Sequence, residues 1–332
     1  MLAILKTTET GLESREEFEP GSWIDLVSPT EEELRRVSGE LNIPLDLLNA
    51  PLDEEEKSRV ELEDGLTLVI VDIPVIVVEG DERNYATIPI GLIVHKDYFI
   101  SICLRANPIL GEFERDSVRG FFTFKKTRFL FQVLQQISAF YLRYLYRIDR
   151  DTDKLERELR ASSRNAEIFD LLNLQKALVY FTTSLRSNES VMQKLLRGKS
   201  VKMYEEDEEL LEDVLVENRQ ASEMAKIYTD ILTGMMDAFA SVISNNLNQV
   251  MKLLTSITIM LSIPVIVSSF YGMNVKLPFI GFAHAFTIVI VIAIAISMAF
   301  WIVFCRTGLL GVFRPFDLLR REHRNSGFVV HL

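Results

Sequence analysis

The chain has 332 residues, of which 48% are hydrophobic, and its 36 basic and 47 acidic residues give a formal net charge of −11. This length and composition suffice for a packed core, but the acidic balance argues against nucleic-acid binding, which calls for clustered Lys and Arg. An acidic surface instead concentrates cations. The two cysteines, Cys103 and Cys305, are not expected to form a structural disulfide.

The first third of the chain alternates strand patterns with a short helix. Trp23 to Val27 reads as a strand, and Thr30 with the three glutamates after it forms a capping box that starts a helix. Further apolar runs read as strands at 66–71, 75–78, 88–94 and 99–104. We therefore expect an α/β domain over residues 1–125.

The middle of the chain has a helical period. Apolar residues recur at steps of three and four from about Phe129 to about Arg160, and a second helix is expected over about 166–196. A polar break separates the two segments, so an antiparallel pair of long helices is predicted within residues 126–205.

A third helix begins near Glu206 and contains no proline until Pro264, so it is expected to span residues 206–271, roughly 95 Å at 1.5 Å per residue. Small or hydroxylated residues recur along it with a period near 3.5, which is coiled-coil spacing. This stripe consists of Asp237, Ser241, Ser244, Asn248, Met251, Thr255, Thr258, Ser262, Val265, Ser269 and Gly272. Such residues either allow close packing of membrane helices or line a water-filled pore.

Two stretches near the C-terminus, 253–270 and 277–305, contain no charged residue. A helix needs roughly 20 apolar residues to cross a bilayer, so both are predicted to span the membrane. Lys252 precedes the first span, and Arg306 and further arginines follow the second, which predicts that both termini are cytoplasmic. The expected segments are a first span at about 252–271, an external loop at 272–282, a second span at 283–305 and a basic cytosolic tail at 306–332.

The first span ends in Tyr271-Gly272-Met273-Asn274, and a second span follows closely. This motif, placed after a long helix and before the second of two C-terminal spans, resembles the CorA family of divalent-cation channels. The resemblance implies a funnel-shaped homopentamer in the cell inner membrane, with subunits, lipid and divalent cations as its partners. It also implies passive passage of Mg²⁺, and of Co²⁺ and Ni²⁺, with Mg²⁺ as a regulator and without an organic cofactor.

The resemblance also assigns roles to single residues. Gly272 and Asn274 would form the selectivity ring, with Tyr271 bracing the turn and Met273 packing it. Asn248 would line the pore, Met251 and Leu254 would form an apolar constriction, and Asp237 would form an acidic ring at the cytosolic entrance. The simpler readings are a helix C-cap at Gly272 and Asn274 and ordinary packing of Met251 and Leu254.

Regulation by a bound cation would need acidic residues at a subunit interface. Asp213 is the candidate on the long helix, and Asn49 and Asp53 lie near the position of its expected partner. A solvated acidic face explains the same residues. The loop from Val275 to Phe279 lacks the acidic residues that many members of the family carry.

Other functions were weighed against the same residues. A zinc transporter of the same superfamily would share the motif, although the four histidines are scattered rather than clustered. A membrane-anchored coiled-coil scaffold without transport activity would not need a polar stripe within the membrane. No nucleotide-binding loop or nucleophile motif stands out, so we expect no enzyme.

Overall fold

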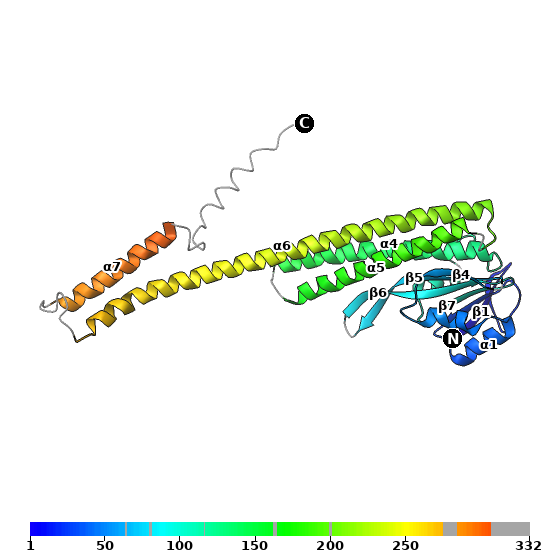
Figure 1. The fold of residues 1–332 in the computed structure, drawn as a ribbon, viewed down its shortest axis with the longest axis horizontal. Helices are drawn as coiled ribbons and strands as arrows, with labels where there is room; N and C mark the ends of the chain where they lie inside the picture. The colour runs from blue at the N-terminus through cyan, green and yellow to red at the C-terminus, as the bar shows by residue number, and fades with distance from the viewer. Residues whose placement is uncertain are drawn as a thin grey trace, which may run out of the picture. The chain divides into compact units, whose positions relative to one another are not determined.

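A computed structural model describes residues 1–63, 65–79, 82–115, 117–161, 165–198, 201–274 and 284–306. The chain divides into two compact units, residues 1–235 and 236–332. The helix α6 (Glu205–Tyr271) contributes its first part to unit 1 and its second part to unit 2. Figure 1 labels the long helices and most of the strands.

Unit 1 contains one seven-stranded sheet with the strand order β2-β1-β3-β7-β6-β5-β4. All neighbouring strands pair antiparallel except β3 and β7, which are parallel. The strands are β1 (Leu2–Thr8), β2 (Gly11–Arg15), β3 (Trp23–Val27), β4 (Arg59–Glu63), β5 (Leu66–Glu79), β6 (Glu82–Val94) and β7 (Phe99–Cys103).

One face of the sheet is covered by α1 (Glu31–Leu41), α2 (Leu45–Asn49) and the 3-10 turn η1 (Ala50–Leu52). The predicted capping box is present, because the Glu33 backbone N–H donates to the Thr30 hydroxyl while the Glu33 carboxylate accepts from the Thr30 N–H. Leu34, Val37 and Leu41 pack with buried strand residues in one hydrophobic cluster. The helix therefore starts and packs where the sequence predicts.

The other face is covered by α4 (Lys126–Ala161) and α5 (Asn165–Arg197), with the short α3 (Pro108–Glu114) beside α4. An aromatic cluster fills the end near α3, where Phe129 lies 4.1 Å from Phe99 and 4.5 Å from Phe121 between ring centroids. The helices α4 and α5 pack against each other and run antiparallel in Figure 1. Their bounds extend the predicted ones by only a few residues.

A buried asparagine ties α5 to the sheet. The Asn188 side chain is fully buried, its amide donates to the Asp72 carbonyl at 2.7 Å, and its oxygen accepts from the Asp72 N–H at 2.9 Å. The strand β4 pairs only with residues 66–70 of β5, so Asn188 takes the place of a missing strand. The backbone nitrogen of Pro74 points to the same edge of β5 as that of Asp72, away from β6. No strand of the described chain pairs with this edge beyond residue 70, so the missing N–H of Pro74 removes no hydrogen bond of the sheet.

The first part of α6 packs on α5. The Asn218 amide is buried and donates to the Leu185 carbonyl at 2.9 Å, while Arg219 forms an ion pair with Glu189 at 2.7 Å. The side chains of Leu211 and Val214 on the same face are fully buried. Within unit 1, α1 and α2 thus lie on one side of the sheet, whereas α4, α5 and the start of α6 lie on the other (Figure 1).

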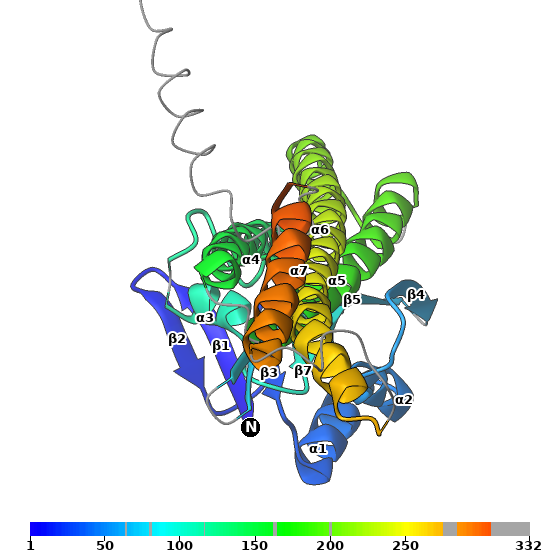
Figure 2. The ribbon, with the colours of Figure 1, turned by 90° about the vertical axis from the view of Figure 1, so that its left-hand side faces the viewer.

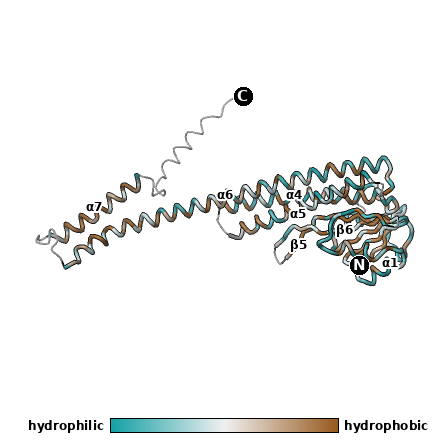
Figure 3. The backbone as a smooth tube through the Cα atoms, viewed as in Figure 1, coloured by the Kyte–Doolittle hydropathy of each residue, from teal (hydrophilic) through white to brown (hydrophobic). Residues whose placement is uncertain are grey.

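The described residues of unit 2 belong mainly to the second part of α6 and to α7 (Ala285–Arg306). Two segments of the described chain, within α6 and at Phe286–Phe304, are long and apolar enough to cross a membrane. Figure 3 shows the hydrophobic colouring that these segments share. In Figures 1 and 2, α7 runs back beside the end of α6. Pro264 lies inside α6, as its position in the sequence predicts.

Several predicted elements differ from the observed ones. The runs predicted as separate strands at 66–71 and 75–78 form the single strand β5, because Pro74 is accommodated at a free edge. The sequence patterns did not indicate β1, β2, β4, α2 or α3, all of which are short. The external loop was predicted at 272–282 and the tail at 306–332. Residues 275–282 of the loop and 307–332 of the tail lie outside the described residues, whereas the whole motif up to Asn274 is described.

Candidate pore helix and Tyr-Gly-Met-Asn motif

The side chains of the predicted stripe are exposed along one face of α6 in unit 2. At about 100° per residue, the stripe residues within the membrane segment cluster around one direction of the helix. The exposed members of this polar stripe are Asp237, Ser241, Ser244, Asn248, Met251, Thr255, Thr258, Ser262, Val265, Ser269 and Gly272. Leu254, which borders the stripe, is exposed as well. A mostly polar face on an apolar helix is thus left open in the protomer.

The opposite face of α6 is the covered one. Ser256 is only 6% exposed, and Leu253, Met260, Ile263 and Val267 are half-buried at steps of three and four. By helical geometry this face lies roughly 150° from the polar stripe. The second span therefore packs on α6 without occupying the stripe.

The covered face of α7 is built from small and aromatic residues. Ala293 is 8% exposed, and Ser297, Trp301 and Phe304 are half-buried along the same side. Small residues let membrane helices approach closely, and α7 runs beside α6 in both views (Figures 1 and 2). Spacing of Ala293 and Ser297 by four residues was the sequence signal for this contact, which our sequence analysis missed.

Hydroxyl groups of the polar stripe donate their hydrogens back to the helix. The Thr258 hydroxyl donates to the Leu254 carbonyl at 2.8 Å, and the Ser262 hydroxyl donates to the Thr258 carbonyl at 2.8 Å. The Ser241 hydroxyl bonds the Asp237 carbonyl in the same way at 3.0 Å. Because each hydrogen is used inside the helix, the oxygen lone pairs remain to accept hydrogen bonds from water.

The helix α6 ends at Tyr271, within the motif. The Gly272 N–H donates to the carbonyls of Ser268 and Ser269 at 3.0 and 3.2 Å, and the Met273 N–H donates to the Phe270 carbonyl at 3.2 Å. Tyr271 is half-buried, whereas Gly272, Met273 and Asn274 are exposed. The Asn274 amide therefore stands at the exposed end of the helix that carries the polar stripe.

Gly272 does not end the helix in the way expected for a glycine cap. The conformation of its backbone lies outside the left-handed region, and an added Cβ would lie 3.5 Å from the carbonyl oxygens of Ser268 and Ser269, an ordinary contact. A Cβ is thus tolerated within one protomer. Glycine's freedom of φ is not what this position uses.

The residues further down α6 lie in the order that the sequence predicts. Met251 and Leu254 are 51% and 57% exposed, although both are apolar. Asn248 lies about one turn before Met251, and Asp237 stands at the beginning of the stripe; both side chains are exposed. The exposed apolar pair is thus flanked by polar positions of the same stripe.

The candidate regulatory residues are not brought together in one protomer. Asp213 is exposed on α6, whereas Asn49 and Asp53 are exposed on the α2 side of the sheet. Desolvation, and next the neighbouring Asp213, raise the pKa of Glu217, so negative charge is crowded on this part of α6. Among the described residues, no group of three or more His, Cys, Asp or Glu side chains could hold a metal ion. A site that uses both sets would require a second copy of the chain.

Unit 1, an α/β domain, leads through one long helix into two candidate membrane helices, and this arrangement defines a two-span membrane protein with a polar stripe. A family model described as "CorA-like Mg2+ transporter protein" matches residues 19–306. The chain therefore belongs to this family of Mg²⁺ and Co²⁺ transporters, which are membrane proteins.

Relatives and solved structures agree with this assignment. The cobalt/magnesium transport protein CorA of Methanocaldococcus jannaschii is 29% identical over 296 residues, which cover 86% of this chain and 90% of that protein. The complete structure of the CorA magnesium transporter from the same organism matches with a TM-score of 0.81 and 27% identity, covering 93% of this chain and 98% of that one. The cytoplasmic domain of ZntB from Vibrio parahaemolyticus, at 12% identity and a TM-score of 0.58, shares the fold of 73% of this chain.

Proposed function

We propose that copies of this chain surround an axis and form a passive channel for hydrated divalent cations, with Mg²⁺ as the principal ion. The observation that carries the proposal is the polar stripe, which is exposed on the face of α6 opposite to α7. One helix cannot enclose a pore, so several stripes must face one another. A homopentamer is proposed on the resemblance to the family.

The chemistry of Mg²⁺ fits the groups on this face. Mg²⁺ prefers oxygen ligands and gives up its water reluctantly, so a pore that accepts hydrogen bonds from the hydration shell avoids that cost. The lone pairs of Thr258 and Ser262 are suited to this task because their hydrogens are bonded to the helix. We assign the selectivity ring to the Asn274 amide and the Gly272 backbone, with Tyr271 and Met273 supporting the turn.

Below the ring, we assign the gate to Met251 and Leu254, since a ring of apolar side chains can close a pore by excluding water. Asn248 would contact the ion below this constriction, and Asp237 would concentrate cations at the cytosolic entrance. We propose that this protein lies in the inner membrane with both termini in the cytoplasm. Lys252 and Arg306, at the ends of the two spans, support this orientation, because basic residues favour the cytoplasmic side.

Regulation by cytosolic Mg²⁺ is proposed at the interface between subunits. Asp213 of one copy would share the ion with Asn49 or Asp53 of its neighbour, because these residues are separated by the sheet in one protomer. Like charges that face each other across an interface repel until a cation neutralises them. Closure of the pore at high internal Mg²⁺ would follow.

The test is ion uptake into liposomes that contain the purified protein, measured for Mg²⁺, Co²⁺, Ni²⁺ and Zn²⁺. Asn274→Ala is expected to abolish selective Mg²⁺ uptake. Asn246→Ala is the matched control, since Asn246 is exposed on the opposite face of α6, and it is expected to leave uptake unchanged.

Two results would contradict the proposal. Uptake of Zn²⁺ without uptake of Mg²⁺ would move the chain to the zinc transporters of the superfamily. A protein that is folded and reconstituted but passes no ion would favour the scaffold interpretation.

A further inference from the structure

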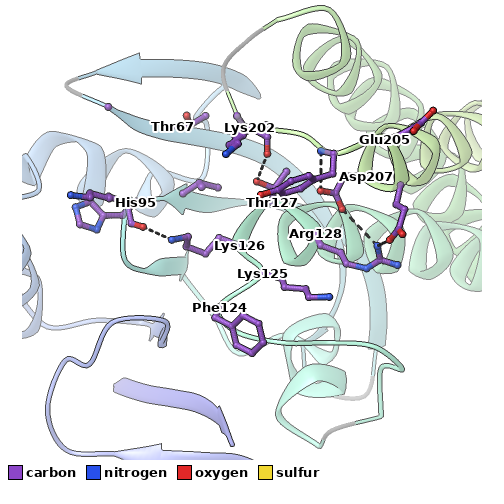
Figure 4. A pocket seen from close by; sticks show the side chains of 16 residues that line it. Thr67, His95, Phe124, Lys125, Lys126, Thr127, Arg128, Lys202, Glu205 and Asp207 are labelled. Atoms are coloured by element: carbon purple, nitrogen blue, oxygen red, sulfur yellow. Dashed lines mark hydrogen bonds and ion pairs between the residues drawn. The ribbon is translucent and has the colours of Figure 1, made fainter.

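Unit 1 contains a cavity of about 1180 Å³ that the transport chemistry does not use (Figure 4). It lies where the turn between β6 and β7 meets the start of α4 and the start of α6. Ligand pockets in proteins commonly measure about 300–1,000 Å³. The cavity is therefore large enough for a small organic molecule and too large for a single ion.

Basic side chains gather around this cavity although the whole chain is acidic. Five permanent cations line it against three carboxylates. The cations, which we term the basic cluster, are Lys96, Lys125, Lys126, Arg128 and Lys202. A local excess of positive charge in a protein of net charge −11 indicates a site for an anion.

The carboxylates at the cavity do not neutralise the lysines. Glu206 and Asp207 pair with Arg128, at 3.3 and 3.8 Å. Asp207 also accepts a hydrogen bond from the Tyr204 N–H at 3.4 Å. Within the described part of the chain, none of the four lysines forms an ion pair with a carboxylate. Asp97, which does not line the cavity, acts on the charge of Lys126, and the Lys125 and Lys202 ammonium groups lie over the rings of Phe122 and Tyr204. The charges of Lys96, Lys125 and Lys202 are therefore not neutralised by these carboxylates and are available to a ligand.

The position of the basic cluster on α4 is electrostatically unfavourable without an anion. Lys125 directly precedes α4, while Lys126 and Arg128 lie in its first turn, which contains no acidic residue. The N-terminus of a helix carries a partial positive charge, so cations there are destabilising and anions are stabilising. The helix is 36 residues long, and a bound phosphate would satisfy both its first amides and the lysines.

The basic groups are held in place by the fold. The Lys126 ammonium donates to the Lys96 carbonyl, and the Thr127 hydroxyl donates to the Lys202 carbonyl at 3.0 Å. These bonds connect the β6–β7 turn, α4 and the segment before α6 around the cavity (Figure 4). Burial lowers the pKa of Lys126 and of His95, and the nearby Asp97 opposes both shifts.

Two exposed aromatic rings complete the lining. Phe124 is 54% exposed and Tyr204 is 66% exposed, and both line the cavity. The Lys202 ammonium lies over the Tyr204 ring, 5.7 Å from its centroid, and the Phe124 ring is tilted against Phe122 at 5.3 Å. A flat base would stack on the ring surface that these contacts leave exposed, while the cations bind phosphate. This combination favours a phosphorylated ligand that carries a ring.

We propose that the cavity between the β6–β7 turn and the starts of α4 and α6 binds a nucleotide, with its phosphates on the basic cluster and its base against Phe124 or Tyr204. The site is separate from the polar stripe and the motif, and it does not depend on which ion is transported.

Binding is tested by calorimetry on the full-length protein in detergent, in low salt and with EDTA, so that divalent-cation sites do not contribute. The probes are ATP, tripolyphosphate, orthophosphate and adenosine. ATP is expected to bind most tightly, tripolyphosphate more weakly, and orthophosphate and adenosine at least tenfold more weakly than ATP. Raising the salt concentration is expected to weaken ATP binding, because the contacts are ionic.

The test variant is Lys96→Ala combined with Lys125→Ala. Both side chains are exposed, so the thermal unfolding temperature is expected to stay within about 2 °C of the parent, since surface changes rarely affect stability. The affinity for ATP is expected to fall at least tenfold, whereas Lys176→Ala, an exposed lysine on α5 outside the cavity, leaves it within twofold. The proposal is overturned if the parent binds no phosphate probe at millimolar concentration, or if the double variant binds ATP as the parent does.

Discussion

A buried carboxyl group in the sheet makes the stability of unit 1 depend on pH. Asp25 lies on β3, is 2% exposed and accepts a hydrogen bond from the Ser101 hydroxyl, which in turn accepts from the Trp23 indole N–H at 2.7 Å. Burial raises the pKa of Asp25 from 3.8 to about 7, against the opposing effect of the Ser101 hydrogen bond. The folded protein therefore keeps a proton that the unfolded chain loses.

The sign and size of the effect follow from linkage. Between pH 3.8 and pH 7 the folded state binds one more proton than the unfolded state, so the free energy of unfolding falls as the pH rises. Each pH unit in this range lowers the free energy of unfolding by about 1.36 kcal/mol. From pH 5 to the folded-state pKa of about 7 the loss is therefore about 2.7 kcal/mol, and little more is lost by pH 8, where the titration of Asp25 is complete. The stabilisation is greatest below pH 3.8 and is lost above pH 7.

The assay uses Trp23 as the reporter. The chain has two tryptophans, so Trp301→Phe leaves Trp23 as the only one, and its fluorescence follows urea unfolding of unit 1 in detergent. In this background, Asp25→Asn should flatten the change between pH 5 and pH 8 by about 2.7 kcal/mol, while Asp46→Asn, at an exposed carboxylate of α2, should not. Identical pH dependence in the parent and the Asp25 variant would refute the reasoning.

Three further outcomes follow from the contacts described above. Asn188→Ala leaves the Asp72 N–H without a partner, while the Asp72 carbonyl keeps the hydrogen bond from the Tyr141 hydroxyl. The free energy of unfolding is expected to fall by about 2 kcal/mol in the same urea titration; a loss below about 0.5 kcal/mol would show that water replaces the side chain. Ser256→Leu should overfill the covered face between α6 and α7 and reduce the yield of folded protein. Ser262→Leu, at an exposed position, should fold normally and reduce Mg²⁺ uptake. Equal yields of the two variants would show that Ser256 is no more tightly packed than Ser262. Gly272→Ala should unfold at the parent's temperature, because a Cβ fits within one protomer. It should lose uptake, because the Gly272 backbone is assigned to the selectivity ring; full uptake would contradict that assignment.

The long helices could be predicted because their signals are local and repeated. The observed bounds of α6, Glu205–Tyr271, differ from the expected 206–271 by one residue, since no proline occurs before Pro264 and the period near 3.5 continues along the helix. The short strands β1 and β2 could not be found in this way, because their residues are mixed in polarity and only the sheet shows that they pair, β1 with β2 in a hairpin and with β3 on its other side. The interruption expected at Pro74 was wrong for the same reason, as only the sheet reveals that its edge is free.

Only part of the candidate site could likewise be predicted from the sequence. The spacing of the polar stripe was visible in the sequence, but the covered face around Ser256 could be found only once α7 lay beside it. The basic cluster is spread over Lys96, Lys125 and Lys202, which are separate in the sequence and meet through the fold. Contacts between subunits, which the regulatory residues require, depend on copies of the chain that one sequence does not describe.

The central claim is that the polar stripe lines the ion path, and neighbouring residues of α6 test it directly. Thr258 belongs to the stripe, whereas Ile257, 37% exposed, lies about 100° away at nearly the same depth. With Cys103 and Cys305 replaced by Ala, we would introduce Thr258→Cys or Ile257→Cys and treat reconstituted protein with a small, charged, membrane-impermeant thiol reagent. The account predicts that the reagent blocks Mg²⁺ uptake by the Thr258 variant and spares the Ile257 variant. Block of both variants alike, or of the Ile257 variant alone, would contradict it.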